Sequence, residues 1–160
     1  AGAWAGAFYG DRAGHGRARL KAGYDVLANH ERVDASKLGA MGFCYGGSVA
    51  LEAAWAGMGV KGVVSFHGNL TTPGEKDKVE AAVLVCNGAA DVWVTPEMIK
   101  TFEGTLSERG ITFDLVSYEG AVHAFTNPGA SERGMDNVKY HKAADEQSWE
   151  AMKAFWAKHL

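Results

Sequence analysis

Short apolar runs alternate with amphipathic segments along the chain, and this alternation limits the folds open to it. The apolar runs predict four β-strands, at residues 37–43, 60–66, 81–87 and 111–118. The amphipathic segments predict four helices, at residues 14–29, 45–56, 96–109 and about 139–158. Strands that are apolar on both faces and separated by helices form a parallel sheet that is covered by helices. We therefore expect an α/β fold with three layers, in which helices lie on both faces of a parallel sheet.

Length and composition favour one domain of this kind. The chain has 160 residues, of which 47% are hydrophobic, and this is enough for a core of ordinary size. We therefore expect residues 1–160 to form a single domain. The formal net charge of −3 gives no electrostatic reason to expect nucleic acid or an anionic membrane as a partner. No apolar run approaches the ~18 residues that a membrane helix needs. We therefore expect the chain neither to bind a membrane surface nor to span a membrane.

The cysteine and histidine content argues against disulfide and metal sites. Two cysteines, Cys44 and Cys86, are too few for a disulfide framework and favour a reducing compartment, the cytoplasm. The six histidines lie far apart, and the sequence contains neither a CxxC nor an HExxH motif. We expect no metal site and no cofactor.

Reactive side chains follow several of the predicted strands. In an open parallel sheet, functional sites lie beyond the carboxyl ends of the strands. Cys44 follows the first strand, Asp91 the third and His123 the fourth. This order predicts a cysteine nucleophile, with His123 as its base and Asp91 as the group that orients the imidazole. His67 follows the second strand, and we expect it to line a pocket or to make a structural hydrogen bond.

Residues 42–47 read G-x-C-x-G-G, which is a nucleophile elbow with cysteine in place of serine. So tight a turn strains the backbone of the nucleophile, and we expect side chains at Gly42 or Gly46 to collide across it. The turn places Cys44 at the start of the next helix, where the helix dipole favours the thiolate. The backbone N–H of Tyr45 is then the expected donor to an oxyanion.

Other interpretations of these residues are open. The glycines loosely resemble a dinucleotide-binding fingerprint, but Cys44 replaces its middle glycine and the next strand does not end in the required acid. Glutamine-amidotransferase-like proteins also carry Gly-x-Cys-x-Gly at a strand–helix turn. Their acid usually follows the histidine by two residues, where this chain has Phe125. A protein without activity that keeps the three side chains as structure is a further alternative.

Three segments of the chain together carry a resemblance to a known family. They are residues 33–47, 84–94 and 118–128. With these segments in this order, the chain resembles the dienelactone hydrolase family of the α/β-hydrolase superfamily, from about residue 15 to the C-terminus. The resemblance implies an α/β-hydrolase-type parallel sheet with helices on both faces.

The resemblance also implies an activity and a site. It implies a Cys44–His123–Asp91 triad that hydrolyses small activated esters or enol lactones through a thioester, without a cofactor. The expected partner is therefore a small-molecule ester or lactone. Trp93 and Phe125 flank the triad residues in the sequence, and we expect them to form an apolar or aromatic substrate pocket.

One position departs from the family pattern. Family members that open dienelactones typically place an arginine four residues after the histidine, to hold the substrate carboxylate. This chain has Asn127 there, and a neutral amide cannot make a charge-assisted bidentate pair. The resemblance therefore does not extend to dienelactone itself as the substrate.

The start of the chain also departs from the family pattern. The family fold has a further N-terminal region, which carries the first strands and a second oxyanion donor, so we expect an N-terminally truncated domain. The strand at residues 37–43 should then pair on one side only and leave Leu38, Met41 and Phe43 without partners. An open strand edge is a template for association, and we expect the chain to self-associate there.

Overall fold

The computed structural model describes residues 2–160 and contains a parallel four-stranded sheet in the order β1-β2-β3-β4. The strands are β1 (Gly39–Phe43), β2 (Gly62–Phe66), β3 (Ala82–Gly88) and β4 (Phe113–Tyr118). Each begins and ends within two residues of its predicted run, so the predicted parallel sheet is confirmed. Because all four strands run the same way, their carboxyl ends meet at one edge of the sheet.

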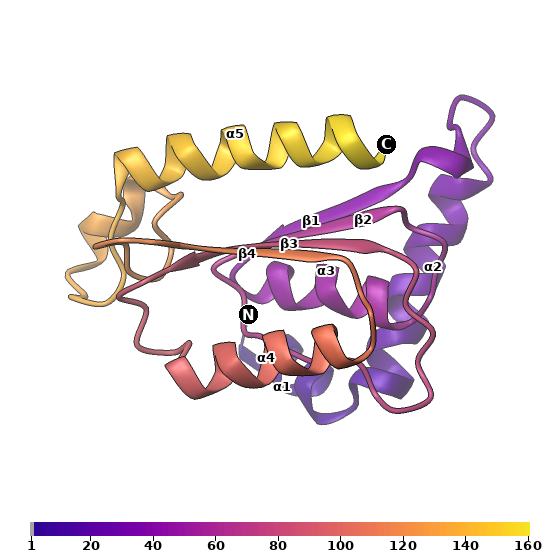
Figure 1. Cartoon of the computed structure of the whole chain (residues 1–160), viewed down its shortest axis with the longest axis horizontal. Helices are drawn as coiled ribbons and strands as arrows, with labels where there is room; N and C mark the ends of the chain where they lie inside the picture. The colour runs from indigo at the N-terminus through magenta and orange to yellow at the C-terminus, as the bar shows by residue number, and fades with distance from the viewer. Residues whose placement is uncertain (1) are drawn as a thin grey trace.

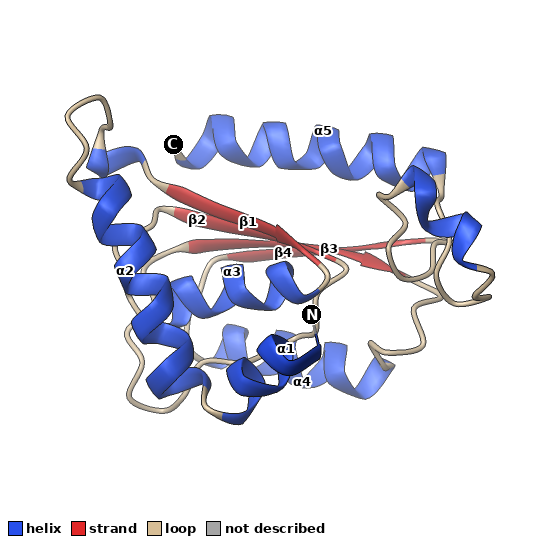
Figure 2. Ribbon diagram, turned by 180° about the vertical axis from the view of Figure 1, so that it is seen from behind, coloured by secondary structure: helices blue, strands red, loops and turns tan. Residues whose placement is uncertain are grey.

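Helices cover both faces of the sheet, as predicted. Figure 1 shows α5 (Lys142–His159) on one face and α3 (Tyr45–Trp55) with α4 (Pro96–Glu108) on the other. Two further helices, α1 (Gly2–Gly10) and α2 (Arg17–Ala28), lie on the same side as α3 and α4 (Figure 2). Helical turns η1, η2 and η3 span Arg12–Gly16, Ala35–Lys37 and Pro128–Arg133. No helix is predicted from the sequence for the segment that forms α1.

The sheet separates two hydrophobic cores. The core under α3 and α4 contains Leu51, Trp55, Val63, Val83, Phe102 and Leu106. The core under α5 contains Val64, Phe66, Leu84, Phe125, Met152 and Phe155. All residues of β2 and β3 are buried, which explains why these strands read as continuous apolar runs.

Trp149 lies outside the buried face of α5 and is 47% exposed. The face of α5 that contacts the sheet runs through Ser148, Met152 and Phe155, which follow one another at helical spacing. Trp149 is one residue, and therefore about 100°, away from that row.

Strand β1 is an edge of the sheet within the described residues, as predicted. It pairs with β2, and its other side has no strand partner. On the face toward α5, Met41 and Phe43 are 41% and 42% exposed. Leu38 was expected to lose partners in the same way, but it is 7% exposed, because it precedes the strand and packs in the core under α3.

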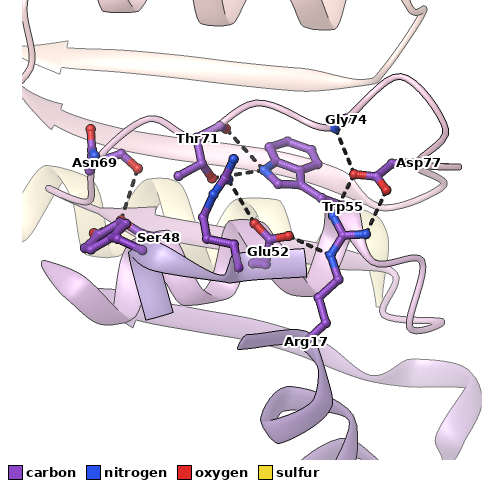
Figure 3. Close-up of polar contacts among 10 residues, drawn as sticks. Arg17, Ser48, Glu52, Trp55, Asn69, Thr71, Gly74 and Asp77 are labelled. Atoms are coloured by element: carbon purple, nitrogen blue, oxygen red, sulfur yellow. Dashed lines mark hydrogen bonds and ion pairs between the residues drawn. The ribbon is translucent and has the colours of Figure 1, made fainter. Parts of the chain in front are cut away.

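A buried ion-pair cluster fixes the N-terminal segment to α3. The Glu52 carboxylate, 1% exposed, accepts hydrogen bonds from Arg12 at 3.0 Å and from Arg17 at 2.7 Å. Arg17 also binds both carboxylate oxygens of Asp77, at 2.7 and 2.6 Å, so it bridges α3 and the loop after β2 (Figure 3). Glu52 lies two turns after Cys44 on α3, so the cluster steadies the helix on which the elbow is built.

Within residues 2–160, no helix combines the length and the apolar character that crossing a membrane requires.

Candidate active site

Cys44 lies at a strained turn between β1 and α3. Its φ of 54° is in the left-handed region, which side chains other than glycine rarely adopt. A Cβ on Gly42 would overlap the backbone carbonyl of Gly46, so this glycine is required for the turn, as predicted. The expected collision at Gly46 is wrong, because a Cβ there would meet no atom within 4 Å. The close approach involves the backbone of Gly46 and not its side-chain position.

The structure brings Cys44, His123 and Asp91 together. His123 Nε2 lies 3.0 Å from Cys44 Sγ, and His123 Nδ1 lies 2.8 Å from Asp91 Oδ2. The other carboxylate oxygen, Asp91 Oδ1, accepts the backbone N–H of Trp93 at 3.0 Å. The imidazole is therefore held between sulfur and carboxylate on opposite nitrogens. The acid in contact precedes the histidine in the sequence, which is the α/β-hydrolase order and not the amidotransferase order.

The charges of the site favour a thiolate–imidazolium pair. The hydrogen bond from His123 lowers the pKa of Cys44; burial opposes this, and the backbone N–H of Tyr45 assists it. Burial alone would lower the pKa of His123, but its hydrogen bonds to Asp91 and Cys44 raise that pKa to about 9. Cys44 also stands at the N-terminus of α3, where the helix dipole stabilises a negative charge.

His67 lies beside this group and fulfils both of the roles left open for it. It lines the cavity at the site, and it hydrogen-bonds through both ring nitrogens. Nδ1 accepts the backbone N–H of Cys44 at 3.1 Å, and Nε2 lies 2.9 Å from Thr126 Oγ1. Burial and the neighbouring His123 lower the pKa of His67 to about 4, so its ring is neutral near pH 7.

A cavity of about 1060 Å³ opens over Cys44 and His123. Trp93 lines it, as predicted, and packs edge-on against His123 with 4.7 Å between ring centroids. The prediction for Phe125 is wrong: this side chain is fully buried under α5 and does not line the cavity. Ala124, with a φ of 58°, precedes it, and Phe125 packs against Tyr118 in the core.

Several residues that line the cavity were not predicted to do so. They come from α1 and from the segment after His123, namely Ala5, Tyr9, Thr126, Arg133, Met135 and Val138. The Tyr9 hydroxyl donates to Ser48 Oγ at 2.8 Å, which attaches α1 to the first turns of α3. Their local sequence does not predict that they line a cavity, because they approach the cysteine only in the folded chain.

The chain matches known proteins over most of its length. Residues 7–160 match the dienelactone hydrolase family. The uncharacterized protein K02A2.1 of Caenorhabditis elegans is 35% identical over 150 residues, which cover 91% of this chain and 94% of that protein. A Bradyrhizobium protein named "Probable 2-oxo-3-(5-oxofuran-2-ylidene)propanoate lactonase" is 31% identical over 110 residues, covering 62% of this chain and 44% of that protein.

A solved structure shares the fold. The crystal structure of a dienelactone hydrolase-like promiscuous phosphotriesterase from metagenomic libraries superposes with a TM-score of 0.90 at 35% identity. The match covers 96% of this chain but 64% of that one, so the chain spans less than two thirds of this relative. Because the family match runs from residue 7 to residue 160, this protein belongs to the dienelactone hydrolase family.

Proposed function

We propose that the protein hydrolyses small activated carboxylic esters or enol lactones, with Cys44 as the nucleophile. The observation that carries this proposal is the contact of His123 with Cys44 Sγ at 3.0 Å and with Asp91 Oδ2 at 2.8 Å. This arrangement has the geometry of a nucleophile, a base and the group that orients the base. Tyr45 supplies a backbone N–H at the same turn, and we assign it as one oxyanion donor.

The reaction follows in two steps. The Cys44 thiolate attacks the carbonyl carbon, the ester C–O bond breaks, and the leaving oxygen takes the proton of the His123 imidazolium. A water then gives a proton to His123 and attacks the thioester, which releases the carboxylic acid and returns the thiolate. The Asp91 carboxylate holds the ring in the correct orientation. No cofactor takes part in either step.

The chemistry of the thiolate limits the substrates. A thiolate leaves more readily than a plain alkoxide, so the first step goes forward less well with a simple alkyl ester than with an ester that releases a stabilised enolate or phenolate. The cavity at the site has a size suited to small molecules, and Tyr45 and Trp93 give it aromatic walls. Among the described residues, Arg133 is the one Lys or Arg that lines the cavity, so we assign it as the group that binds a carboxylate of the substrate. Asn127 also lines the cavity. The name of the Bradyrhizobium relative supports lactones as substrates.

A second candidate activity is the cleavage of phosphotriesters. The observation that favours it is the likeness to the promiscuous phosphotriesterase, at 35% identity over 96% of this chain. A thiolate can attack a phosphorus that carries a good leaving group from the same position. Hydrolysis of an aryl dialkyl phosphate by the protein tests this activity directly, and its absence would remove the candidate without affecting the ester proposal.

Exchange of Cys44 tests the main proposal against the alternative of an inactive protein. Cys44→Ala should abolish hydrolysis of an activated aryl ester. Cys86→Ala is the matched control, because burial raises the pKa of Cys86 to about 12 and keeps that thiol inert. Retained turnover in Cys44→Ala would contradict the proposal. The dependence on a free thiolate also supports a reducing, cytoplasmic location.

A further inference from the structure

His67 connects the nucleophile to the loop that carries the base. It follows β2, and its Nδ1 accepts the backbone N–H of Cys44 at 3.1 Å, a donor that is shared with the Phe66 carbonyl at 2.9 Å. A backbone N–H can only donate, so Nδ1 carries no hydrogen. In the neutral ring the hydrogen is then on Nε2, which donates to Thr126 Oγ1 at 2.9 Å. The two contacts together define one tautomer.

Both ends of this connection reach the reacting groups. At one end the backbone of Cys44 is held in its strained conformation, with a φ of 54°. At the other end Thr126 lies three residues after His123 in the same loop. The rings of His67 and His123 also pack edge-on, with 5.0 Å between their centroids. Any movement of the elbow relative to the His123 loop would therefore break a contact of His67.

The backbone of His67 is itself strained. Its φ is 39°, and its residue is 3% exposed. A non-glycine residue keeps such a conformation only when the surrounding structure fixes it, and such residues are concentrated at functional sites. In this conformation the imidazole lies against the backbone of Cys44, whose N–H it accepts at 3.1 Å.

We propose that His67 is a positioning residue, which holds the Cys44 elbow and the His123 loop at the separation that the thiolate–imidazolium pair requires. This inference rests on the proposed function, and it adds a fourth side chain to the cysteine, histidine and aspartate. His67 acts through Cys44 and Thr126 and takes no proton from the substrate.

The charges around His67 keep it in the state that this role needs. The groups that face it are the imidazolium of His123 and, with the opposite sign, the carboxylate of Asp91. Burial and the charge of His123 outweigh Asp91 and lower the pKa of His67 to about 4. Protonation would place a hydrogen on Nδ1 against the N–H of Cys44. His67 is therefore a neutral acceptor throughout the range in which the thiolate reacts.

Three variants test this role. His67→Phe keeps an aromatic ring but removes both hydrogen bonds, His67→Asn keeps an acceptor close to the position of Nδ1, and Thr126→Val removes the other end of the connection. Each is assayed for kcat and KM with an activated aryl ester and for the pH dependence of Cys44 alkylation by iodoacetamide. The melting curve of each variant tests whether it is folded.

The expected result separates positioning from mere packing. His67→Phe should lower kcat by about 10- to 100-fold and leave KM nearly unchanged. The loss of hydrogen-bond partners that orient metal ligands in metalloenzymes has an effect of this size. His67→Phe should also raise the alkylation pKa of Cys44, because the hydrogen bond from His123 that lowers this pKa becomes misaligned. His67→Asn should recover part of both effects. Thr126→Val should shift both in the same direction by a smaller amount.

Each outcome has a defined meaning. A folded His67→Phe protein with unchanged kcat and alkylation pKa would overturn the proposal. If His67→Phe does not fold, Thr126→Val decides, and unchanged values in that variant would overturn the proposal as well. Retained activity in Cys44→Ala would instead remove the proposed function. An inactive Cys44→Ala beside a fully active His67→Phe would remove the positioning role alone.

Discussion

The two edge strands of the sheet, β1 and β4, each lead to one half of the Cys44–His123 contact, yet their exposed faces differ. On the side of α5, β1 presents Met41 and Phe43, which are 41% and 42% exposed. On the same side, β4 presents Asp114 and Val116, and the aspartate is exposed. A charge on an edge strand opposes pairing with another chain. The sequence of β1, GAMGF, contains no charge at all.

This difference indicates that β4 is suited to exposure to solvent, whereas β1 is suited to contact with another polypeptide segment. The nucleophile thus follows the strand with the less protected edge, whereas the base follows the better protected one. We propose that, where nothing else covers it, β1 mediates self-association of the chain. The geometry of the site then depends on how well the β1 side is held.

The largest effect is expected at the elbow on the β1 side. Gly42→Ala places a Cβ against the carbonyl of Gly46, so the backbone must move. We expect a loss of about 3 kcal/mol of stability together with loss of ester hydrolysis. Gly46→Ala is the matched control, because its Cβ meets open space, and it should change stability by less than about 1 kcal/mol. Chemical denaturation measures both, and equal effects would contradict the account of the turn.

The next largest effect is expected where His123, on the β4 side, is oriented. Asp91→Asn keeps the shape of the side chain but removes the charge that faces His123 Nδ1 at 2.8 Å. We expect kcat to fall by about 10²- to 10⁴-fold. The pKa of His123 should also move down from about 9, because Asp91 is the first of the partners that raise it. Steady-state kinetics and histidine titration by NMR measure the two effects, and an unchanged kcat would exclude Asp91 as the orienting acid.

The pH dependence of activity reports separately on Cys44, which follows β1, and on His123, which follows β4. His123 must be protonated to give a proton to the leaving oxygen, and its pKa is raised to about 9. Activity should therefore fall as the pH rises through about 9. The acid limb reports Cys44, whose pKa is lowered from 9.0, so activity should persist well below the ordinary pKa of a thiol. A profile that rises steadily through pH 9 would mean that the reactive sulfur is not paired with His123.

The smallest effect on the folded chain is expected from charges added to the edges. Met41→Lys on β1 should weaken self-association, whereas Val116→Lys on β4 should leave it unchanged. Both positions are at least 36% exposed, so each change should alter stability by less than about 0.5 kcal/mol. Sedimentation velocity over a range of concentrations measures the association. An equal response of the two variants would show that the edges do not differ as described.

Much of the fold was predictable because it depends on local patterns. Strands β2 and β3 are buried on both faces, so their sequences are continuous apolar runs that can be recognised directly. Cys44, Asp91 and His123 could be grouped because parallel strands bring their carboxyl ends to one edge, which is a consequence of topology alone. The turn itself requires a glycine at position 42, because a Cβ there would overlap the backbone of Gly46.

What could not be predicted depends on side-chain direction and on distant contacts. Phe125 is close to His123 in the sequence but turns into the core beyond Ala124, and no local pattern reports that turn. The hydrogen bond of His67 to the backbone of Cys44 arises from a strained φ that the sequence does not reveal. Tyr9 reaches the cavity from α1, a segment of small and apolar residues without a clear period.

The most direct test of the central claim is to trap the acyl group on the enzyme. The protein is mixed with an activated aryl ester, quenched in acid within the first turnovers and digested for mass spectrometry. We predict an adduct with the mass of the acyl group on the peptide that contains Cys44, and no adduct on the peptide that contains Cys86. Turnover at the normal rate without an adduct on Cys44, and unchanged in Cys44→Ala, would contradict the account.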